Sequence, residues 1–357
     1  MDTATENQID KLLKASGLFP DIEKPAQNIS NFDFSNETIL ITGAAGSIGS
    51  ELSKQLTRCK FKTLVLIDIA ESPLHDLMNE SEFENIPNVN FLILNITQKD
   101  ALEHLFQTFK PTIIFHTAAY KHVPLMELNP LESIKVNIFG TQILADLAIK
   151  HKIKKFIFIS TDKAVNPISV MGLSKRISED YLFSLDKSNS TLFLTTRFGN
   201  IFGSNGSVVP LFKKRIETEQ SITITHEAIS RYFINKAKAC QLILQIAKND
   251  SDENKLFTFN MGNSIKITDL VERLITFCNK KQVEIKFSTL RAGEKLHEDL
   301  VSENEILLPT ANKDIFIVKK RKNDVFPKTY LKNLSEITAS MPNKDVKSIL
   351  NSYLEHI

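Results

Sequence analysis

The sequence predicts an α/β protein built on a Rossmann-type, doubly wound parallel sheet, with a smaller C-terminal domain. Short apolar runs rich in β-branched and aromatic residues alternate with helical stretches between residues 38 and 197. That alternation is typical of parallel strands buried under helices on both faces of a sheet. A glycine-rich turn joins the first apolar run to a helix, as dinucleotide-binding folds require. Beyond Asn200 the alternation loosens into turn-rich segments, which indicates a second domain.

The predicted strands and helices follow in order along the chain. Six apolar runs are predicted strands: Thr38–Thr42, Thr63–Asp68, Asn90–Leu94, Thr112–His116, Lys155–Ser160 and Thr191–Arg197. The helical stretches between them include Ser47–Thr57 and Ile134–His151. A helix near Lys236–Lys248, a strand near Leu256–Met261 and a helix near Ile267–Lys280 come later.

The first 35 residues are predicted to form an arm. Ile9, Leu12 and Leu13 share one face of a short helix, so the arm is expected to pack on the body or on a partner subunit. The rest divides into two predicted domains: 36–200, with returning elements at about 236–262, for the dinucleotide, and 201–235 with 263–357 for the substrate.

The composition limits the classes of protein. The 357 residues carry a net charge of +2, so no basic surface for nucleic acid is expected. Three scattered cysteines form no CxxC pair and no His/Cys cluster, so no metal site is predicted. Met1–Lys14 lack the apolar core of a signal peptide, and no apolar run reaches the ~18 residues that span a bilayer. We therefore expect a cytoplasmic protein without membrane insertion.

The glycine-rich turn is the predicted cofactor site. Its glycines Gly43, Gly46 and Gly49 are spaced GxxGxxG. Gly43 permits a tight turn, Gly46 lets backbone N–H groups approach a pyrophosphate, and Gly49 lets the helix pack closely. Further contacts are predicted from the same turn at Ala45, Ser47 and Ile48.

Residues after the next two strands are predicted to contact the adenosine half of the cofactor. Asp68 ends the second strand about 20 residues after the turn, where a carboxylate binds the ribose 2′-hydroxyl. Ile69 and Ala70 supply no cation for a 2′-phosphate, so NAD is favoured over NADP. Asn95 follows the third strand; its side-chain carbonyl could accept from adenine, or the residue could simply end the strand.

Longer motifs run through much of the chain. They are HTAA at 116–119, AYKHVPLME at 119–127, STDKAVNP at 160–167, MGLSKR at 171–176, RFGN at 197–200, GSVVPLF at 206–212 and RAGEK at 291–295. With the glycine spacing, they resemble the extended short-chain dehydrogenases/reductases. More closely, they resemble the UDP-N-acetylglucosamine 4,6-dehydratases of the polysaccharide-biosynthesis family. The resemblance covers roughly residues 8 to 300 and, in larger members, only the cytoplasmic catalytic portion.

The resemblance implies a lyase that uses NAD to remove water from UDP-N-acetylglucosamine without net oxidation. The product would be UDP-2-acetamido-2,6-dideoxy-xylo-4-hexulose, for bacterial surface glycans. By resemblance, Asp162 is the acid that protonates the departing 6-hydroxyl and Lys163 is the base that takes the carbon-5 proton. An enclosed Asp can keep a proton and an enclosed Lys can lose one, and adjacent groups titrate as a pair.

Position 171 departs from the wider superfamily, where Tyr-x-x-x-Lys deprotonates the hydroxyl being oxidised. This chain has Met171 and Lys175 at that spacing, and a thioether holds no exchangeable proton. Met171 is therefore predicted to shape the site, and Lys175 to bind the nicotinamide ribose. We hypothesise that Asp162, through Thr161 or water, accepts the 4-hydroxyl proton.

The substrate residues are predicted with alternatives. Arg231 and Arg291 are candidates for the UDP pyrophosphate, because a guanidinium fits phosphate oxygens, although either could make a surface ion pair. Asn200 and Ser207 could bond the diphosphate or sugar. Val209 begins an apolar stretch to Phe212 that could face uracil or fill the core. The motifs also imply cofactor contacts at Ile96, Ala118 and Ala119 and substrate contacts at Lys121, His122 and Glu294.

Two histidines lie in the motifs, and two other residues differ from the family pattern. His116 is expected to pack beside the cofactor loop, and neither it nor His122 has metal-ligand spacing. Asn235 and Ala292 stand where the family pattern has Thr and Pro, which leaves the substrate open.

Other functions stay open on the sequence. A UDP-sugar 4-epimerase normally relies on the Tyr that is absent here. A dehydratase that inverts carbon 5 differs in the face on which carbon 5 is reprotonated. The N-terminal arm and Val170–Gly172 favour the dehydratases that retain the carbon-5 configuration. A non-catalytic NAD-binding protein would not need Asp162 and Lys163. A homo-oligomer is expected, in which the helices Ile134–His151 and Met171–Leu185 could pair across a dimer.

Overall fold

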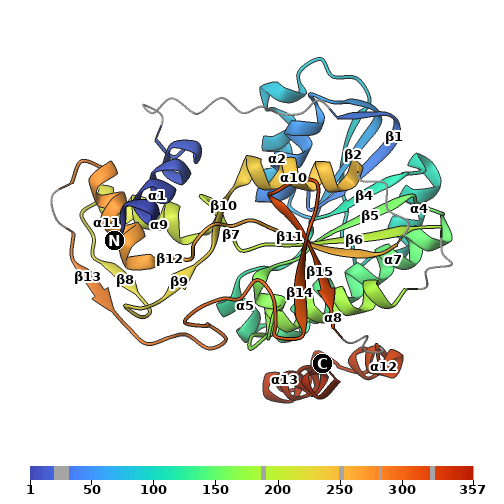
Figure 1. Ribbon diagram of the computed structural model, residues 1–357. Coiled ribbons are helices and arrows are strands. Elements are labelled where there is room, and N and C mark those ends of the chain that lie inside the picture. The colour runs from blue at the N-terminus through green and yellow to red at the C-terminus, as the bar shows by residue number, and fades with distance from the viewer. Residues whose placement is uncertain (20–31, 186–189, 249–252, 281–282, 322–325, 357) are drawn as a thin grey trace.

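The computed structural model describes residues 1–19, 32–185, 190–248, 253–280, 283–321 and 326–356. A nine-stranded sheet runs through the centre in the order β14-β15-β11-β6-β5-β4-β1-β2-β3 (Figure 1). The pairs from β11 to β3 are parallel, whereas β14 and β15 are antiparallel additions at one edge. The strands are β1 (Asp33–Thr42), β2 (Lys60–Asp68), β3 (Val89–Ile93), β4 (Ile113–His116), β5 (Lys155–Ile159), β6 (Leu192–Arg197), β11 (Lys255–Phe259), β14 (Glu305–Pro309) and β15 (Ile315–Lys320). The predicted Rossmann-type sheet is confirmed.

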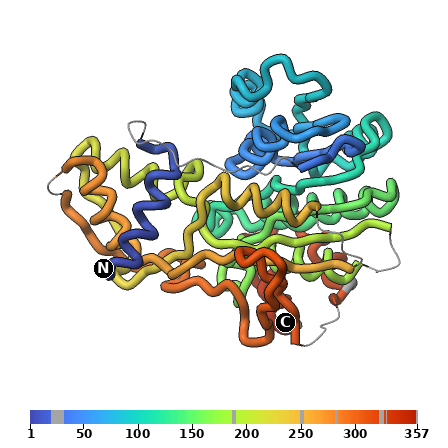
Figure 2. The backbone as a smooth tube through the Cα atoms, turned by 45° about the horizontal axis from the view of Figure 1, so that its top comes forward, coloured from blue at the N-terminus to red at the C-terminus, as the bar shows by residue number. Residues whose placement is uncertain are grey.

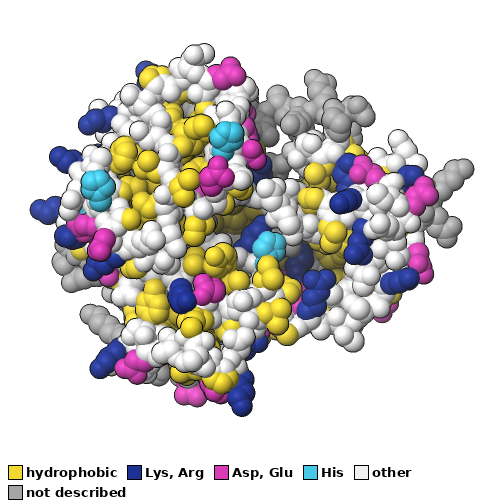
Figure 3. Space-filling model, turned by 180° about the vertical axis from the view of Figure 1, so that it is seen from behind, with side chains coloured by type: hydrophobic (Ala, Val, Ile, Leu, Met, Phe, Trp, Pro, Cys, Tyr) yellow, Lys and Arg dark blue, Asp and Glu magenta, His cyan; other side chains and the backbone are white. Residues whose placement is uncertain are grey.

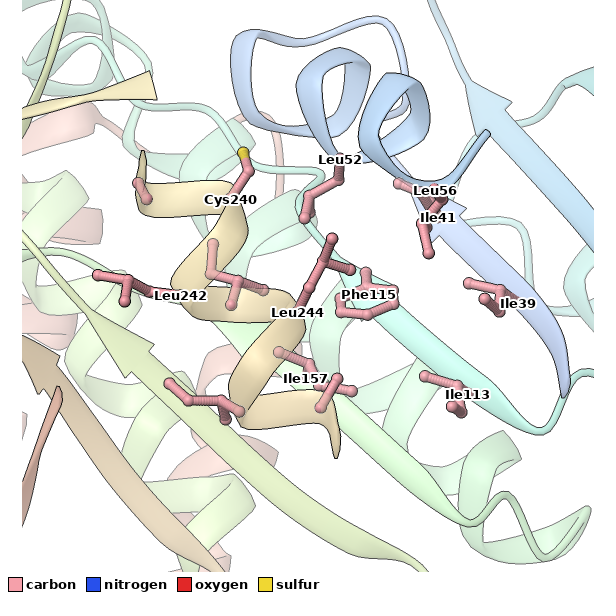
Figure 4. Close-up of a cluster of buried hydrophobic side chains, with 14 of the residues drawn as sticks. Ile39, Ile41, Leu52, Leu56, Ile113, Phe115, Ile157, Cys240, Leu242 and Leu244 are labelled. Atoms are coloured by element: carbon pink, nitrogen blue, oxygen red, sulfur yellow. The ribbon is translucent and has the colours of Figure 1, made fainter. Parts of the chain in front are cut away.

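Helices cover both faces of this sheet. On one face α2 (Ser47–Leu56) and α10 (Lys236–Lys248) lie side by side, and their Leu52, Leu56 and Leu244 side chains meet those of β1, β4 and β5 (Figure 4). The short α3 (Glu71–Met78) and the 3-10 turn Ser81–Phe83 add to the same cluster. The other face carries α4 (Lys99–Phe109), α7 (Thr141–Lys150) and α8 (Val170–Ser184). Because both faces are covered, the buried parts of the central strands are mostly apolar.

The predicted helix Ile134–His151 has a different internal structure. It is divided into α6 (Pro130–Ser133), a π-helical segment (Ile134–Gly140) and α7. The hydroxyls of Thr141 and Ser178 donate to the carbonyl of Asn137 at 2.6 Å and 2.7 Å, and the Asn137 amide bonds the backbone of Tyr120. Side chains that take over a backbone carbonyl in this way accompany irregular helix turns.

A smaller body lies beside the carboxyl ends of the central strands and has its own core. It consists of β7 (Asn200–Phe202), α9 (Val208–Glu217), β8 (Ile222–Ile224), β9 (Ser230–Arg231), β10 (Phe233–Asn235), β12 (Ile265–Lys266), α11 (Ile267–Phe277) and β13 (Ile285–Phe287). The arm helix α1 (Thr3–Ala15) lies beside α9 and α11 (Figure 2). Its Ile9 and Leu13 are fully buried there, and Arg273 of α11 bonds Asp10 at 2.6 Å. The arm therefore packs on the body of its own chain; its residues 20–31 lie outside the described part.

The C-terminal third departs from the predicted division of domains. Residues 263–357 were assigned to the substrate side, yet β15 pairs with β11 and β14 pairs with β15, so both strands extend the large sheet. The helices α12 (Lys328–Ser335) and α13 (Asn343–Asn351) and the 3-10 turn Ser352–His356 pack against α8, α6 and α5 (Val123–Leu128). β15 has the apolar run 315–318 and lies between β11 and the edge strand β14, a position that the sequence pattern alone did not assign.

The same packing corrects the expected dimer contact through Met171–Leu185. In α8 the residues Val170–Asp180 are buried, and Tyr330 and Tyr353 from the C-terminal segment belong to the same cluster. Figure 1 shows α12 and α13 beneath α8. Because this chain covers residues 170–180 of α8 with its own helices, those residues are not available to pair with a partner subunit, and the dimer itself stays a prediction.

The lengths of the helices and the charges on the surface bear on the class of protein. Within the described ranges, no helix combines the length and the apolar character needed to cross a bilayer. On the face seen in Figure 3, Lys and Arg side chains are interspersed with Asp and Glu side chains. This mixture fits the small net charge of +2.

Candidate active site

The turn between β1 and α2 forms a tight cradle. Gly43 has a φ of +68°, and a Cβ built on it would lie 2.6 Å from the Cα of Ala118. Only glycine allows the loops after β1 and β4 to approach so closely. Gly46 is the N-cap of α2, and the first turn of that helix contains no acidic side chain. The N–H groups and the positive dipole end of α2 therefore suit a pyrophosphate. A Cβ on Gly49 would lie 2.2 Å from the Gly43 carbonyl oxygen, in agreement with the predicted close packing.

Asp68 and Asn95 both make hydrogen bonds within this region. The Asp68 carboxylate accepts from the N–H groups of Ala45 and Ala70, each at 2.9 Å, so it fixes the glycine turn to the end of β2. The Asn95 Oδ1 accepts from the N–H and the hydroxyl of Thr97 at 3.0 Å and 2.9 Å. Its side-chain carbonyl is thus engaged locally, which favours the strand-end alternative over the adenine contact.

The other predicted cofactor residues surround the cradle. Ser47 Oγ accepts from the N–H of Asn205 at 3.1 Å, which joins the turn to the loop before α9. Ile48 packs against the core beneath α2 and Ile96 is 5% exposed. Ala118 packs partly buried behind β4, and Ala119 next to it is half-buried.

Lys175 and His116 lie buried beside the cradle. Lys175 is 5% exposed, and its Nζ lies 3.8 Å from the centre of the Phe158 ring. Burial lowers the pKa of Lys175 to about 7. The His116 ring is held between the hydroxyls of Thr42 and Thr141 at 2.7 Å and 2.9 Å. Burial, and then the nearby Lys175, lower the pKa of His116 well below its usual value, so it is a neutral packing residue, as expected.

Asp162 and Lys163 form a pair at the end of β5. Asp162 is fully buried, and its Oδ1 accepts from the Thr161 hydroxyl and from Lys163 Nζ, each at 2.9 Å. Its Oδ2 is buried without a hydrogen-bond partner among the described residues. Thr161 also caps the short turn that carries both residues. Lys163 Nζ donates in addition to Oδ1 of Asn200 at 3.1 Å.

The N-terminus of α8 packs against the turn that carries Asp162 and Lys163. A Cβ on Gly172 would lie 2.2 Å from the carbonyl oxygen of Lys163, so helix and turn are in direct contact. Met171 is 4% exposed and belongs to the cluster formed by α5, α8 and the C-terminal helices. That environment agrees with a packing role for Met171.

A cavity of about 380 Å³ opens beside Lys163. Five cationic side chains and two carboxylates line it: Lys121, Lys163, Arg215, Arg231, Arg291, Glu294 and Glu298. Apolar side chains of α9 and β8, among them Leu211 and Ile224, form another part of its wall. A cavity with excess positive charge and one apolar wall suits an anionic ligand that has a flat or apolar end.

The predicted diphosphate residues meet at this cavity. Arg231 is 7% exposed and is fixed by the carbonyls of Ser230 and Leu296 at 2.7 Å and 3.1 Å. Glu294 lies 3.6 Å from Arg231 and accepts from the backbone N–H of Arg291 at 3.1 Å. The two arginines and Glu294 therefore share one rim of the cavity.

Four further predicted residues lie at or near the same cavity, in different roles. Asn200 bonds Lys163, so it orients the base candidate. Ser207 Oγ is buried and has no hydrogen-bond partner among the described residues. Lys121 Nζ donates to the carbonyl of Asn205 at 3.0 Å, and a Cβ on Gly206 would lie 2.8 Å from the His122 ring. These contacts connect the 119–127 and 203–207 loops over the cavity.

Val209 does not contact the cavity. It is fully buried in the core of the smaller body with Phe212 and Ile216, one and two turns along α9. Val208 and Leu211, on the other side of the helix, line the cavity instead. The predicted apolar wall is present, but the assignment of Val209 to it is wrong, because the helical period turns Val209 toward the core.

The structure adds Glu298 and explains Asn235. Glu298 is 6% exposed, lines the cavity and was missed, because one Glu within a charged stretch carries no sequence signal. Asn235, which departs from the family pattern, donates to the carbonyl of Ala15 at 2.9 Å and so anchors α1. Ala292 is exposed beside Arg291.

A second cavity of about 430 Å³ lies between α1, α2 and α10. Its lining includes Lys54 and Lys236, but these are ion-paired with Glu80 and Glu51. It contains none of the predicted catalytic residues. Across the described part of the chain, no group of three or more His, Cys, Asp and Glu side chains could hold a metal ion.

The chain is similar to known proteins in sequence and in overall fold. The family described as "Polysaccharide biosynthesis protein" matches residues 39–320. The "Capsular polysaccharide biosynthesis protein CapD" of Staphylococcus aureus is 42% identical over 279 residues, which are 77% of this chain and 46% of that protein. The chain thus spans about half the length of this curated relative.

Relatives with assigned activities are also found. A "UDP-N-acetylglucosamine 4,6-dehydratase (inverting)" of Campylobacter jejuni is 35% identical and covers 76% of this chain and 79% of its own. A "UDP-glucose 4-epimerase" of Rickettsia rickettsii is 31% identical and covers 76% and 80%. The solved structure of Pen from Bacillus thuringiensis superposes with a TM-score of 0.73 at 33% identity, over 80% of this chain and 90% of that one.

Proposed function

The chain belongs to the polysaccharide-biosynthesis family of extended short-chain dehydrogenases/reductases, and on that premise we propose that it is a UDP-N-acetylglucosamine 4,6-dehydratase. The proposed product is UDP-2-acetamido-2,6-dideoxy-xylo-4-hexulose, a precursor for bacterial surface glycans. The observation that carries the proposal is the Asp162–Lys163 pair, with 2.9 Å between Nζ and Oδ1, at the wall of a cationic cavity. Water elimination needs an acid at the 6-hydroxyl and a base at the carbon-5 proton, side by side, whereas 4-epimerisation needs a proton acceptor only for the 4-hydroxyl.

The cradle around Gly43 fits NAD. The positive φ of Gly43, the open N-terminus of α2 and the Asp68 carboxylate match the turn, pyrophosphate and ribose requirements of a dinucleotide. Lys175 is the residue proposed to bind the nicotinamide ribose. The chemistry that NAD supplies when bound is reversible hydride transfer between carbons 4 and 6 of the sugar.

The proton steps use this chain's own residues. Asp162, reached directly or through the Thr161 hydroxyl, accepts the proton of the 4-hydroxyl as carbon 4 is oxidised. Lys163, as the amine, takes the carbon-5 proton, and protonated Asp162 gives its proton to the departing 6-hydroxyl, which leaves as water. Lys163 then returns its proton to carbon 5 as carbon 6 is reduced. The 2.9 Å bond between the pair lets one proton lie on either group without any net change of charge.

The cavity supplies binding for the nucleotide end. Arg231 and Arg291 are the proposed diphosphate ligands, because a guanidinium presents paired donors to phosphate oxygens. The buried Ser207 hydroxyl, which lacks a partner among the described residues, is the proposed sugar or phosphate contact. Val208 and Leu211 replace Val209 as the apolar wall for uracil.

The test is incubation of the NAD-loaded protein with UDP-N-acetylglucosamine, followed by mass spectrometry and proton NMR of the fresh product. We expect a product lighter by one water, with a methyl group at carbon 6. Asp162→Asn should form no product, and Glu132→Gln, an exposed carboxylate remote from this pair, is the matched control. Unchanged substrate or a mass-neutral UDP-sugar would contradict the proposal.

Two other activities have specific support and are decided by the same spectra. The Campylobacter jejuni relative favours inversion at carbon 5, which would appear as a changed coupling pattern of the carbon-5 proton. The Rickettsia rickettsii relative favours 4-epimerisation, which would leave the mass unchanged. Met171 argues against epimerisation, because it removes the phenol that usually serves the oxidation step.

A further inference from the structure

Glu298 brings a second carboxylate to the Asp162–Lys163 pair. It follows the 291–295 motif on a loop from the opposite wall of the cavity, and its side chain is 3% exposed. Glu298 Oε1 lies 3.7 Å from Lys163 Nζ. Its Oε2 is buried without a hydrogen-bond partner among the described residues. A carboxylate this enclosed requires a charge partner, and Lys163 is the nearest cation.

Three oxygen atoms surround Lys163 Nζ. Asp162 Oδ1 and Asn200 Oδ1 lie at 2.9 Å and 3.1 Å, and Glu298 Oε1 completes the set from the other side. An ammonium group has three N–H donors; Asp162 and Asn200 accept two of them, and Glu298 at 3.7 Å makes an ion pair beside the third rather than a hydrogen bond. The Nζ is therefore surrounded by groups from three separate segments of the chain: the end of β5, β7 and the loop after β13.

We propose that Glu298 is a positioning residue that holds Lys163 Nζ in place and tunes its hold on a proton. This inference rests on the proposed dehydratase function, in which Lys163 is the carbon-5 base. In this proposal Glu298 acts through Lys163, and no contact between Glu298 and the reacting carbons of the sugar is proposed.

The charges around Glu298 support this role. Burial is the largest influence and raises the pKa of Glu298. The charge of Lys163 then lowers it, Asp162 raises it, and the cations Arg231 and Lys295 lower it. Two carboxylates thus compete for one ammonium, and each keeps one oxygen for which the described residues supply no hydrogen-bond partner. Removing the charge of Glu298 must weaken the hold of Lys163 on its proton.

The experiment compares Glu298→Gln with Asp299→Asn in the NAD-loaded protein. Asp299 is the adjacent, exposed carboxylate, so its variant makes the same charge change outside the cavity. The Lys163 Cε signal is followed by NMR against pH with ¹³C-labelled lysine and is assigned through Lys163→Met. We expect Glu298→Gln to lower the titration midpoint of Lys163 by about one pH unit or more, and Asp299→Asn to leave it unchanged.

Activity gives a second, separate readout. Glu298→Gln should lower kcat at least tenfold and move its pH profile in the same direction, with KM within about twofold of the parent. Glu298→Asp should recover part of kcat. A rise in KM at constant kcat would assign Glu298 to substrate binding and overturn the proposal. Unchanged cofactor content and thermal midpoint show that the variant is folded.

Failure of the two proposals can be told apart. If the parent releases no water from UDP-N-acetylglucosamine but Glu298→Gln still lowers the Lys163 midpoint, the dehydratase assignment fails and the tuning of Lys163 stands. If the midpoint is unmoved, the role of Glu298 is overturned whatever the activity.

Discussion

A Cβ placed on Gly49 would lie 2.2 Å from the carbonyl oxygen of Gly43, closer than real Cβ contacts. The first helix after the cofactor turn therefore rests directly on that turn. The atoms that this Cβ would meet, the Gly43 carbonyl and the Ala44 Cα, belong to backbone, so they cannot move without reshaping the pyrophosphate site. This contact connects the glycine spacing in the sequence with the geometry of the cradle.

Gly49→Ala should consequently disturb both stability and cofactor binding. We expect a loss of about 1–3 kcal/mol in the free energy of unfolding, typical of an overpacked site, and at least tenfold weaker NAD binding. Thermal denaturation and fluorescence titration with NADH measure the two effects. Ser50→Ala, one residue along α2, is the control and should change neither. NAD affinity equal to that of the parent would contradict the proposed site.

Lys175 should make the stability of the unliganded protein depend on pH. Its folded pKa is about 7, and an unfolded lysine releases its proton near pH 10.4. The unfolded chain therefore binds more protons between these values, so stability rises with pH there, by up to about 1.4 kcal/mol per pH unit. Below pH 7 the full cost of the buried charge is present.

Lys175→Met tests this dependence. The variant should be more stable than the parent at pH 6, and the difference should shrink steadily toward pH 10. Urea unfolding at several pH values measures it, with Lys135→Met, at an exposed position, as the control. If the free energies of unfolding of Lys175→Met and of the parent changed with pH in parallel, Lys175 would not be the source of the pH dependence.

Arg197 holds two distant segments to the large sheet. It is fully buried on β6 and donates to Glu179 of α8 at 2.6 Å and to Glu305 of β14 at 2.9 Å. Arg197→Met should leave two buried carboxylates unpaired and cost about 3–5 kcal/mol. Lys135→Met, which breaks the exposed pair with Glu132, should cost at most about 1 kcal/mol. Chemical denaturation measures the free energy of unfolding of both variants. Equal losses in the two variants would contradict the proposed role of Arg197.

Substitutions at Val209 and Leu211 should have different effects, one on stability and the other on binding of the UDP-sugar. Val209→Ala removes fully buried methyl groups and should lower stability by about 1–3 kcal/mol, with little change in KM. Leu211 is 49% exposed and lines the cavity, so Leu211→Ala should raise KM for the UDP-sugar several-fold and leave the thermal midpoint within a degree or two. The reverse pattern would restore Val209 to the binding wall.

The sequence was sufficient for features that depend on residues close together in the chain. The positions of the strands, the glycine turn with its φ of +68° at Gly43, and the pairing of Asp162 with Lys163 all follow from local pattern. The arm helix was also predicted, because its apolar residues share one face. Where the predicted helix Ile134–His151 became irregular, the cause was a set of contacts to Asn137 from other segments.

Contacts between distant segments were decided only by the tertiary structure. Val209 and Leu211 are both apolar and lie two residues apart, and the tertiary packing determines which one faces the core. Glu298 reaches Lys163 across 135 positions of sequence, and β15 joins the large sheet between β11 and the edge strand β14. Periodicity reports which face of an element is buried but not what covers it, because long-range pairing depends on the assembled surfaces of the whole chain.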